Sequence, residues 1–292
     1  MKNKISAVLI VKNEEQILEK CLKSIQGIDE IIIVDTGSDD KTPEIARRYT
    51  KKVFINEYKW NDNFAEARNY AKTKATGNWI LSIDADEELE RGGIKKIREA
   101  IATAENNSID VIMCGKNTTF YFPRIFKNKP EIFWRGVAHN YLNITEENRS
   151  DIHINYSYSP AHQKDPDRTL RILKKAVCEN PALTREMFYL AREYAYKKSW
   201  PTAIYWLERY IKKDTWPPEK AHAYILLSKA RWSMGEVNQA KNACLQAIKI
   251  NNDNQSALKL MADLSGPNNK KRWLEFTKTA TNKNVLFKEN IS

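Results

Sequence analysis

The chain has 292 residues, of which 42% are hydrophobic and 10% aromatic, and this is enough apolar material for one large or two ordinary cores. Such a composition excludes a disordered or collagen-like chain. Apolar runs stay far below the ~20 residues that span a bilayer, and no signal-peptide core precedes the first strand-like segment, so we expect a cytoplasmic protein. Four widely spaced cysteines without a C-x-x-C pair are expected to be buried thiols.

The net charge of +11 is unevenly distributed along the chain. Residues 1–165 hold 25 basic and 25 acidic side chains, whereas residues 166–292 hold 23 basic and 12 acidic ones. A bias of this size attracts anionic partners if the lysine pairs at 174–175, 197–198, 212–213 and 270–271 share one face. If they are dispersed, they only keep the domain soluble.

Up to about residue 115, short β-branched runs alternate with helical stretches. This alternation predicts right-handed crossovers and an open, doubly wound, mainly parallel α/β sheet. The expected strands are Ile5–Val11, Glu30–Val34, Lys52–Ile55, Trp79–Ile83 and Ile109–Met113, and the expected helices are 14–26, 41–50, 63–76 and 87–105. The aromatic-rich stretch 116–160 indicates antiparallel strands and loops that complete the sheet.

From Asp167 onward, apolar residues recur at three- and four-residue spacing, which predicts helices. Leu190-Ala191 is echoed 37 residues later by Leu227-Ser228, and Met261-Ala262 follows 34 residues after that. Small residues at repeated positions let paired helices approach closely, as in tetratricopeptide repeats. We therefore predict a catalytic domain over residues 1–163 and a basic, tetratricopeptide-like helical domain for acceptor or partner binding over residues 164–292.

The clearest chemical pattern is the segment Leu81-Ser82-Ile83-Asp84-Ala85-Asp86-Glu87-Glu88. Two carboxylates at positions i and i+2 after a buried strand point to the same side, at the sheet edge where open α/β folds bind ligands. Such oxygen ligands suit Mg²⁺ or Mn²⁺, which neutralises a diphosphate. The competing interpretation is an acidic helix N-terminus stabilised by the helix dipole.

A second acidic residue, Asp35, follows the apolar run Ile31–Val34 and precedes a polar turn with one glycine. Its carboxylate is suited to accept a hydrogen bond from the imide N–H of a uracil. Asp39 and Thr42, further along the same turn, are expected to cap and shape it.

Four segments in this order make the chain resemble a family 2 glycosyltransferase with the GT-A fold. The matching segments are 6–15, 34–40, 65–69 and 79–87. Two further stretches, 122–126 and 134–139, extend the resemblance to a subgroup with C-terminal tetratricopeptide-like helices, which includes lipopolysaccharide-core and peptide glycosyltransferases.

The resemblance implies that Glu15 and Asp35 bind the uridine and that Arg68 lies by the uracil or the diphosphate. The full set of implied donor-binding residues is Val11, Glu15, Asp35, Arg68, Asp84, Ala85 and Asp86, with Asp86 and His162 as metal ligands. Without the resemblance, Arg68 is better interpreted as a surface cation paired with Glu66 or Asp62.

The catalytic base is not settled by these motifs. Relatives commonly carry His-Glu where this chain has His139-Asn140, so the acid that serves as base in relatives is missing here. His139 is the candidate proton acceptor because imidazole titrates near neutral pH, although a structural role beside Trp134 is the alternative. His162, in the loop before the helices, is either a late ligand suited to Mn²⁺ or a turn residue.

Together these features predict a metal-dependent, inverting glycosyltransferase that uses a UDP-sugar such as UDP-glucose and an acceptor hydroxyl or thiol; inversion is implied by the family. The acceptor is left open between nucleic acid, peptide and phosphorylated or lipid-linked glycan, with peripheral membrane contact as a further option. One alternative is a non-catalytic, tetratricopeptide-type scaffold with a relic nucleotide-binding domain. A nucleotidyltransferase is disfavoured because Lys12-Asn13-Glu14-Glu15 is not a glycine-rich phosphate loop.

Overall fold

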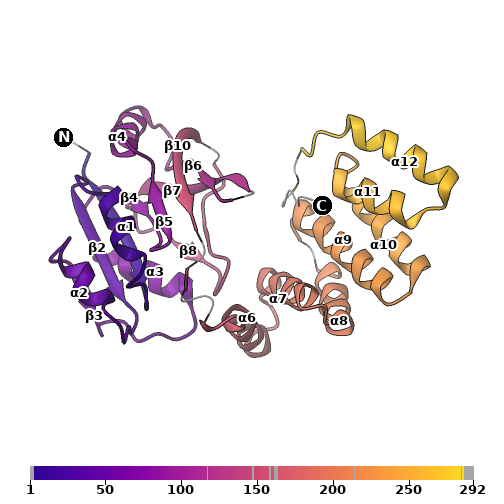
Figure 1. Cartoon of the computed structure of the whole chain (residues 1–292), viewed down its shortest axis with the longest axis horizontal. Coiled ribbons are helices and arrows are strands. Elements are labelled where there is room, and N and C mark those ends of the chain that lie inside the picture. The colour runs from indigo at the N-terminus through magenta and orange to yellow at the C-terminus, as the bar shows by residue number, and fades with distance from the viewer. Residues whose placement is uncertain are drawn as a thin grey trace. The chain divides into compact units, whose positions relative to one another are not determined.

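The computed structural model describes residues 3–116, 118–146, 148–157, 159–160, 164–213, 215–283 and 285. The chain divides into two compact units, Met1–Arg168 and Thr169–Ser292 (Figure 1). In the described part of the chain, no helix combines the length and apolar character required to cross a membrane.

The first unit is built on an eight-stranded sheet with the strand order β3-β2-β1-β4-β7-β6-β10-β5. Its strands are β1 Ile5–Val11, β2 Glu30–Asp35, β3 Val53–Ile55, β4 Trp79–Ser82, β5 Glu87–Leu89, β6 Ser108–Cys114, β7 Thr119–Lys127 and β10 Arg149–Tyr156. Two short strands, β8 Trp134–Arg135 and β9 Tyr141–Leu142, pair separately. The helices of this unit are α1 Leu18–Ser24, α2 Thr42–Arg47, α3 Phe64–Thr73 and α4 Gly93–Thr103.

Both faces of the central strands are covered by helices. Leu22 of α1 and Ile97 of α4 pack on one face, while Ala71 of α3 and Trp134 pack on the other. The neighbouring strands β3, β2, β1 and β4 run parallel, and β7 enters antiparallel between β4 and β6. The predicted GT-A-type, doubly wound, mainly parallel α/β sheet is thereby confirmed.

Several local predictions for this unit were wrong. Residues 87–105 were expected to form one helix, but Glu87–Leu89 is strand β5, and α4 begins only at Gly93. β5 forms because it pairs antiparallel with β10, which lies over 60 residues further along the chain, and because Leu89 is buried in the core. Strand β10 was expected to be antiparallel, yet it also pairs in parallel with β6.

The second unit is helical in its described residues. Its helices are α6 Arg168–Glu179, α7 Thr184–Tyr196, α8 Trp200–Ile211, α9 Pro217–Ser233, α10 Val237–Ile250, α11 Gln255–Leu264 and α12 Pro267–Thr279. The repeated small residues Ala191, Ser228 and Ala262 are completely buried on α7, α9 and α11, the first helices of three successive pairs. This confirms the prediction of tetratricopeptide-like helices. Of the cysteines expected to be buried, Cys178 on α6 is exposed.

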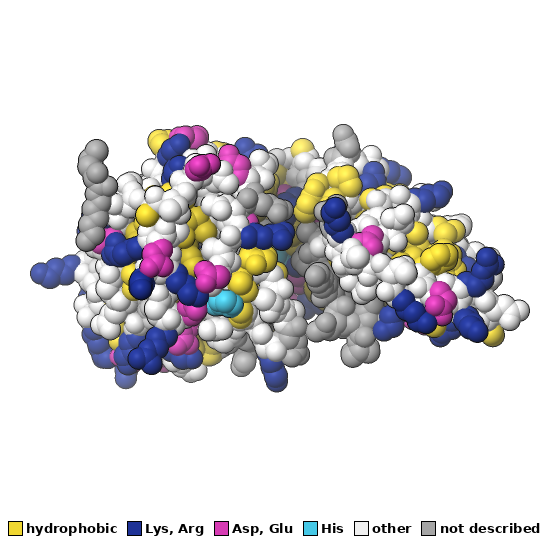
Figure 2. Space-filling model, turned by 90° about the horizontal axis from the view of Figure 1, so that it is seen from above, with side chains coloured by type: hydrophobic (Ala, Val, Ile, Leu, Met, Phe, Trp, Pro, Cys, Tyr) yellow, Lys and Arg dark blue, Asp and Glu magenta, His cyan; other side chains and the backbone are white. Residues whose placement is uncertain are grey.

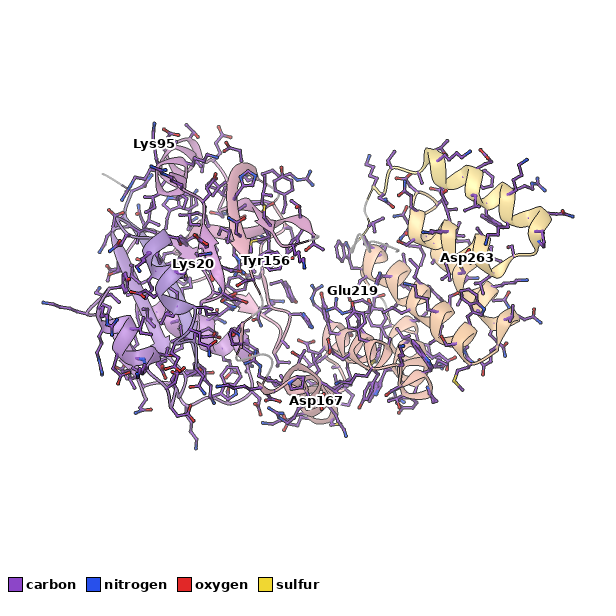
Figure 3. All side chains as sticks on the ribbon, in the orientation of Figure 1. Lys20, Lys95, Tyr156, Asp167, Glu219 and Asp263 are labelled. Carbon is purple, nitrogen blue, oxygen red and sulfur yellow. The ribbon has the colours of Figure 1, made fainter. Side chains whose placement is uncertain are left out.

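A buried carboxylate joins three helices of this unit. Glu219 at the start of α9, labelled in Figure 3, accepts hydrogen bonds from Arg185 Nη1 of α7 at 2.8 Å and from the Tyr210 hydroxyl of α8 at 2.7 Å. Burial raises the pKa of Glu219, and the Arg185 guanidinium opposes that shift. These contacts hold the first two helix pairs in register.

Two lysine pairs of the second unit lie at opposite ends of one helix. Lys197 and Lys198 precede α8 and Lys212 and Lys213 follow it, so the two pairs lie about 18 Å apart along a helix of twelve residues. On the face of the molecule that Figure 2 shows, basic side chains of this unit stand in several groups. The hypothesis of a single shared basic face stays a prediction.

Candidate functional site

The predicted acidic residues meet at one edge of the sheet. Because β1 and β2 are parallel, Val11 lies directly opposite Asp35 where both strands end. Strand β4 runs parallel to β1 on its other side and leads into the loop that contains Asp84 and Asp86. The carboxyl ends of three parallel strands thus gather these side chains at the position where open α/β sheets bind ligands.

Asp35 is buried, and only one of its two carboxylate oxygens is satisfied. Oδ1 accepts hydrogen bonds from the backbone N–H groups of Gly37 and Ser38, both at 2.8 Å, in a turn where Gly37 has a φ of 110°. Oδ2 is buried and has no hydrogen-bond partner in the described part of the chain. An unsatisfied buried acceptor costs about 1–3 kcal/mol, so this oxygen is suited to a donor from a ligand.

The loop after β4 holds Asp84 between two arginines. Its Oδ1 lies 2.7 Å from Arg68 Nη2 of α3, and its Oδ2 lies 3.2 Å from Arg124 Nη2 of β7. Although burial opposes its charge, these two guanidinium groups hold the pKa of Asp84 below its usual range. Asp84 is therefore an ionised, neutralised carboxylate.

Asp86 contrasts with Asp84 because none of the ion pairs formed by the described residues includes it. Burial and the nearby Asp84 carboxylate raise the pKa of Asp86 to about 6. Burial also raises the pKa of Glu14 to about 7, against two hydrogen bonds from the Ser159 hydroxyl at 2.9 and 2.7 Å.

Nearby arginines offset the raised pKa of each acid only in part. The hard oxygen donors of these two acids fit Mg²⁺ or Mn²⁺. Within the described residues, no group of three or more His, Cys, Asp or Glu side chains is arranged to hold a metal.

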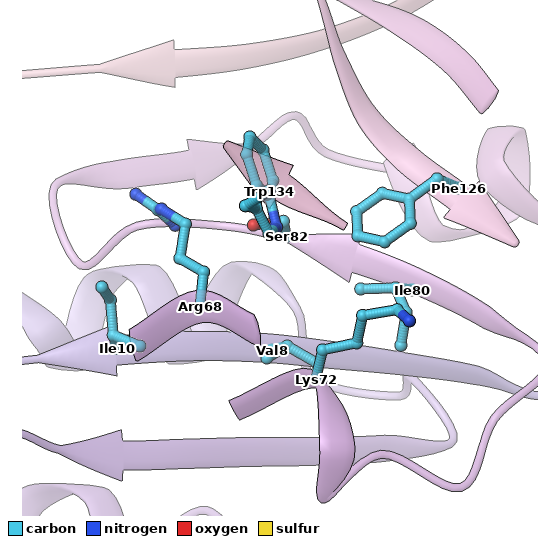
Figure 4. Close-up of a pocket in the computed structure, with 8 residues that line it drawn as sticks. All are labelled: Val8, Ile10, Arg68, Lys72, Ile80, Ser82, Phe126 and Trp134. Carbon is cyan, nitrogen blue, oxygen red and sulfur yellow. The ribbon is translucent and has the colours of Figure 1, made fainter. Parts of the chain in front are cut away.

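Arg68 belongs to the site and not to the outer surface. Helix α3 starts at an Asn63 cap that accepts from Glu66 N at 3.1 Å, and one turn later Arg68 lies over the Trp134 ring at 5.3 Å. Its Nε contacts Asn140 Oδ1 at 3.4 Å. Figure 4 shows Arg68 and Lys72 pointing in opposite directions along a small pocket that Ser82 and Trp134 also line. The interpretation of Arg68 as a surface partner of Glu66 or Asp62 is wrong.

The remaining predicted residues lie around this edge in different roles. The Val11 carbonyl accepts from Thr36 N at 3.0 Å, Ala85 is buried in the core, and the Glu15 side chain accepts from the backbone N–H of Lys41 at 3.1 Å. His139 has a φ of 51° and precedes Asn140, the contact of Arg68, in sequence. His162 lies outside the described residues.

Three residues that the motifs contained received no role from sequence reasoning: Glu14, Glu87 and Arg124. Arg124 is 7% exposed and Glu87 is 4% exposed, and the two form an ion pair beside Asp84. The available signal was a single cation within the apolar run Phe122-Pro123-Arg124-Ile125-Phe126, because a buried arginine requires a buried acid.

An open, mainly parallel α/β sheet with an acid at the end of its second strand and an acidic loop after its fourth is a fold of the GT-A type. The chain belongs to glycosyl transferase family 2, whose family model matches residues 6–160.

Two relatives are similar to part of this chain. A TPR repeat-containing protein of Synechococcus elongatus is 36% identical over 140 residues, which cover 46% of this chain and 34% of that protein. The glycosyltransferase SunS of Bacillus subtilis is 36% identical over 110 residues, 37% of this chain and 26% of SunS. The matches to these relatives thus cover about a quarter to a third of their lengths.

Solved structures show more distant similarity. Residues 1–349 of TarS from S. aureus match 96% of this chain and 88% of that chain, with 15% identity and a TM-score of 0.44. Glucosyl-3-phosphoglycerate synthase from Mycobacterium tuberculosis, solved with Mg²⁺ and UDP, matches 39% of this chain and 44% of that chain, with 24% identity and a TM-score of 0.34.

Proposed function

We propose that this glycosyltransferase moves a hexosyl group from a UDP-sugar, such as UDP-glucose, to an acceptor hydroxyl or thiol, with inversion at the anomeric carbon and with a divalent metal ion. The observation that carries the proposal is the presence, at one sheet edge, of a buried unsatisfied acceptor at Asp35 and of a carboxylate at Asp86 that forms no ion pair within the described residues. The Asp35 oxygen suits the N–H of a nucleotide base, and the Asp86 carboxylate suits a cation bound to a diphosphate.

Asp35 Oδ2 is the proposed contact for uracil. Uracil carries a donor N–H at N3, whereas cytosine carries a lone pair there, which a carboxylate oxygen repels. A buried carboxylate that already accepts two backbone hydrogen bonds through Oδ1 cannot rotate to avoid that repulsion without losing them. This supports uridine as the nucleoside of the donor.

Asp86 would hold Mn²⁺ or Mg²⁺ together with diphosphate oxygens, the ligands that such ions commonly combine in proteins. When bound, the ion supplies positive charge that stabilises the departing diphosphate. Arg68 contributes a fixed guanidinium beside the same loop, held in place by Asp84 and Trp134.

In the transfer step, a lone pair of the acceptor oxygen or sulfur forms a bond to the anomeric carbon from the face opposite the diphosphate. The bond from that carbon to the diphosphate oxygen breaks, and its electron pair leaves with UDP. His139 is the proposed acceptor of the proton released from the acceptor group. His162 is the proposed additional metal ligand.

The helical unit is the proposed binding surface for the acceptor or its carrier. Its excess of basic residues supports an anionic carrier, for which nucleic acid and phosphorylated glycolipid are the two classes to be compared. A peptide acceptor and contact with the membrane surface are the alternatives with which these two classes are compared.

The function is tested by incubating the purified chain with a panel of UDP-sugars and Mn²⁺ and measuring the release of UDP. We expect slow hydrolysis of one UDP-sugar, abolished by EDTA. If no nucleotide sugar is hydrolysed and UDP with Mn²⁺ does not raise the melting temperature, the scaffold interpretation replaces the enzymatic one.

A further inference from the structure

We propose that Glu87 and Arg124 are positioning residues that hold the Asp84–Asp86 loop in the shape that binds the metal and nucleotide. The inference rests on the proposed function and deepens it, because it states how the chain prepares one of its two loop acids for a cation. Neither residue belongs to the donor-binding set that the sequence motifs implied.

The position of Arg124 results from an irregularity in the sheet. Ile109 of β6 lies opposite Ile125 of β7, but Asp110 lies opposite Pro123, so Arg124 is an extra residue on β7. Such a β-bulge redirects a side chain, and a proline, which lacks a backbone N–H, is tolerated at a bulge. Arg124 is buried at this bulge, next to Ile125 and Phe126, which pack on opposite faces of the sheet.

Glu87, Arg124 and Asp84 form a closed ring of contacts. Arg124 Nη2 donates to Asp84 Oδ2 at 3.2 Å and to Glu87 Oε1. The other oxygen of Glu87, Oε2, accepts the backbone N–H of Asp84 at 2.9 Å, and the backbone N–H of Glu87 donates to the Asp84 carbonyl at 3.0 Å. The ring thus restrains both the backbone and the side-chain rotamer of Asp84.

The same loop is restrained again at its far end. The Asp86 carbonyl accepts from the backbone N–H of Ser157 at 2.9 Å and from the Ser157 hydroxyl at 3.2 Å. With Asp84 held by the ring and the Asp86 backbone held by Ser157, the Asp86 carboxylate is the group of this loop that remains available to a ligand.

Arg124 also determines how charge is shared between the acids. Burial lowers the pKa of Arg124, but the carboxylates of Glu87 and Asp84 raise it overall. The guanidinium therefore remains charged. Together with Arg68 it neutralises Asp84 and Glu87. Without Arg124, two further buried carboxylates would compete with Asp86 for a cation or repel its charge.

The test compares Arg124→Lys and Glu87→Gln with the wild-type chain. Lysine keeps the charge but lacks the planar guanidinium that reaches two carboxylates, while glutamine keeps an acceptor for the Asp84 N–H but loses the ion pair. Binding of Mn²⁺ in the presence of saturating UDP is measured from the electron paramagnetic resonance signal of free Mn²⁺. Because the loss of supporting contacts typically costs 10–100-fold in metal affinity, we expect about 100-fold weakening for Arg124→Lys and about 10-fold for Glu87→Gln.

Arg98→Lys is the matched control. Arg98 forms a two-pronged ion pair with Asp29, at 2.9 and 3.1 Å, ahead of β2 at the opposite edge of the sheet. Its substitution is expected to leave Mn²⁺ affinity unchanged. All variants are compared below their own melting temperatures, so that a loss of stability alone does not alter the result.

Mn²⁺ affinities of both variants within twofold of the Arg98→Lys value would overturn the positioning role and leave the ring as a purely structural feature. If Arg124→Lys does not fold, the Glu87→Gln measurement decides by the same criterion. Absence of metal-dependent UDP binding by the wild-type chain would instead refute the proposed function, and the inference with it.

Discussion

The two ends of strand β2 carry the buried carboxylates Glu30 and Asp35, and their surroundings differ completely. Glu30, at the beginning of the strand, accepts from Ser6 Oγ, from Lys52 Nζ, and from the backbone N–H and hydroxyl of Thr76 at 2.8 and 2.7 Å. Asp35, five residues later, leaves Oδ2 without a partner in the described part of the chain. A buried acid that stabilises the fold is saturated, whereas one that is prepared for a ligand is not.

The pKa values follow the same contrast between the two edges of the sheet. Burial alone would raise the pKa of Glu30. The hydrogen bonds from Lys52, Ser6 and Thr76 outweigh it and lower the pKa to about 2. Burial and Asp84 raise the pKa of Asp86 to about 6 at the other edge. Substitutions at the two edges are therefore expected to separate stability from function.

The largest effect is expected at Asp86. Asp86→Ala removes the carboxylate that we propose binds the metal ion. A loss of several kcal/mol of transition-state stabilisation corresponds to about 10³-fold slower sugar transfer. Metal-dependent UDP binding should be lost as well. The melting temperature should stay unchanged or rise, because the substitution removes a poorly compensated buried charge. Full activity in this variant, or in EDTA, would contradict the assignment.

The opposite outcome is expected at Glu30. Glu30→Ala leaves buried donors of Ser6 and Thr76 without an acceptor, so the free energy of unfolding should fall by about 3 kcal/mol. Urea titration measures this loss, and UDP hydrolysis by the folded fraction should stay at the wild-type rate. A variant as stable as wild type would show that the saturated contacts at this edge contribute little.

The same residue predicts a pH dependence of stability. Because folding lowers the pKa of Glu30 from 4.5 to about 2, its ionised contacts stabilise the fold fully above pH 4.5 and lose this contribution as the pH falls toward 2. The difference in unfolding free energy between wild type and Glu30→Gln should therefore shrink between pH 5 and pH 2. A difference that is constant over this range would mean that the pKa is not lowered.

A smaller effect is expected at Asp35. Asp35→Asn places an amide where the carboxylate accepts, and loss of one ligand hydrogen bond of about 1.4 kcal/mol should weaken UDP binding about tenfold. Binding of CDP should weaken less, because an amide N–H can donate to the cytosine lone pair. The check is thermal stabilisation by UDP, CDP and GDP, with UDP the most effective for wild type. Equal shifts for all three would remove Asp35 from the base pocket.

The smallest effect concerns the helical unit. Since the pairs at 197–198 and 212–213 lie about 18 Å apart, one pair alone should neutralise about two phosphates, and binding to a polyanion through one pair should show a logarithmic salt slope near −2. Replacing Lys197 and Lys198 by serine, or Lys212 and Lys213 by serine, should each change binding only slightly. A slope of −6 or steeper for the intact chain would indicate that the separate groups act on one ligand together.

The amino-acid sequence by itself determined the architecture and predicted the edge of the sheet at which ligands bind. Alternating apolar runs defined the sheet, repeated small residues such as Ala191 and Ser228 defined the helix pairs, and the carboxylates after β2 and β4 marked the functional edge. These features depend on local periodicity and on the rule that parallel strands end at the same edge.

Only the tertiary structure decided which of these residues are prepared for ligands. Strand β5, the two arginines around Asp84 and the Glu87–Arg124 ring depend on pairing between segments 16 to more than 60 residues apart. A bulge of one residue on β7 changes which side chain reaches the loop. The Oδ2 atom of Asp35 is unsatisfied because no donor in the described part of the chain lies near it. Register and burial are properties of the assembled sheet, so no local pattern in the sequence could reveal them.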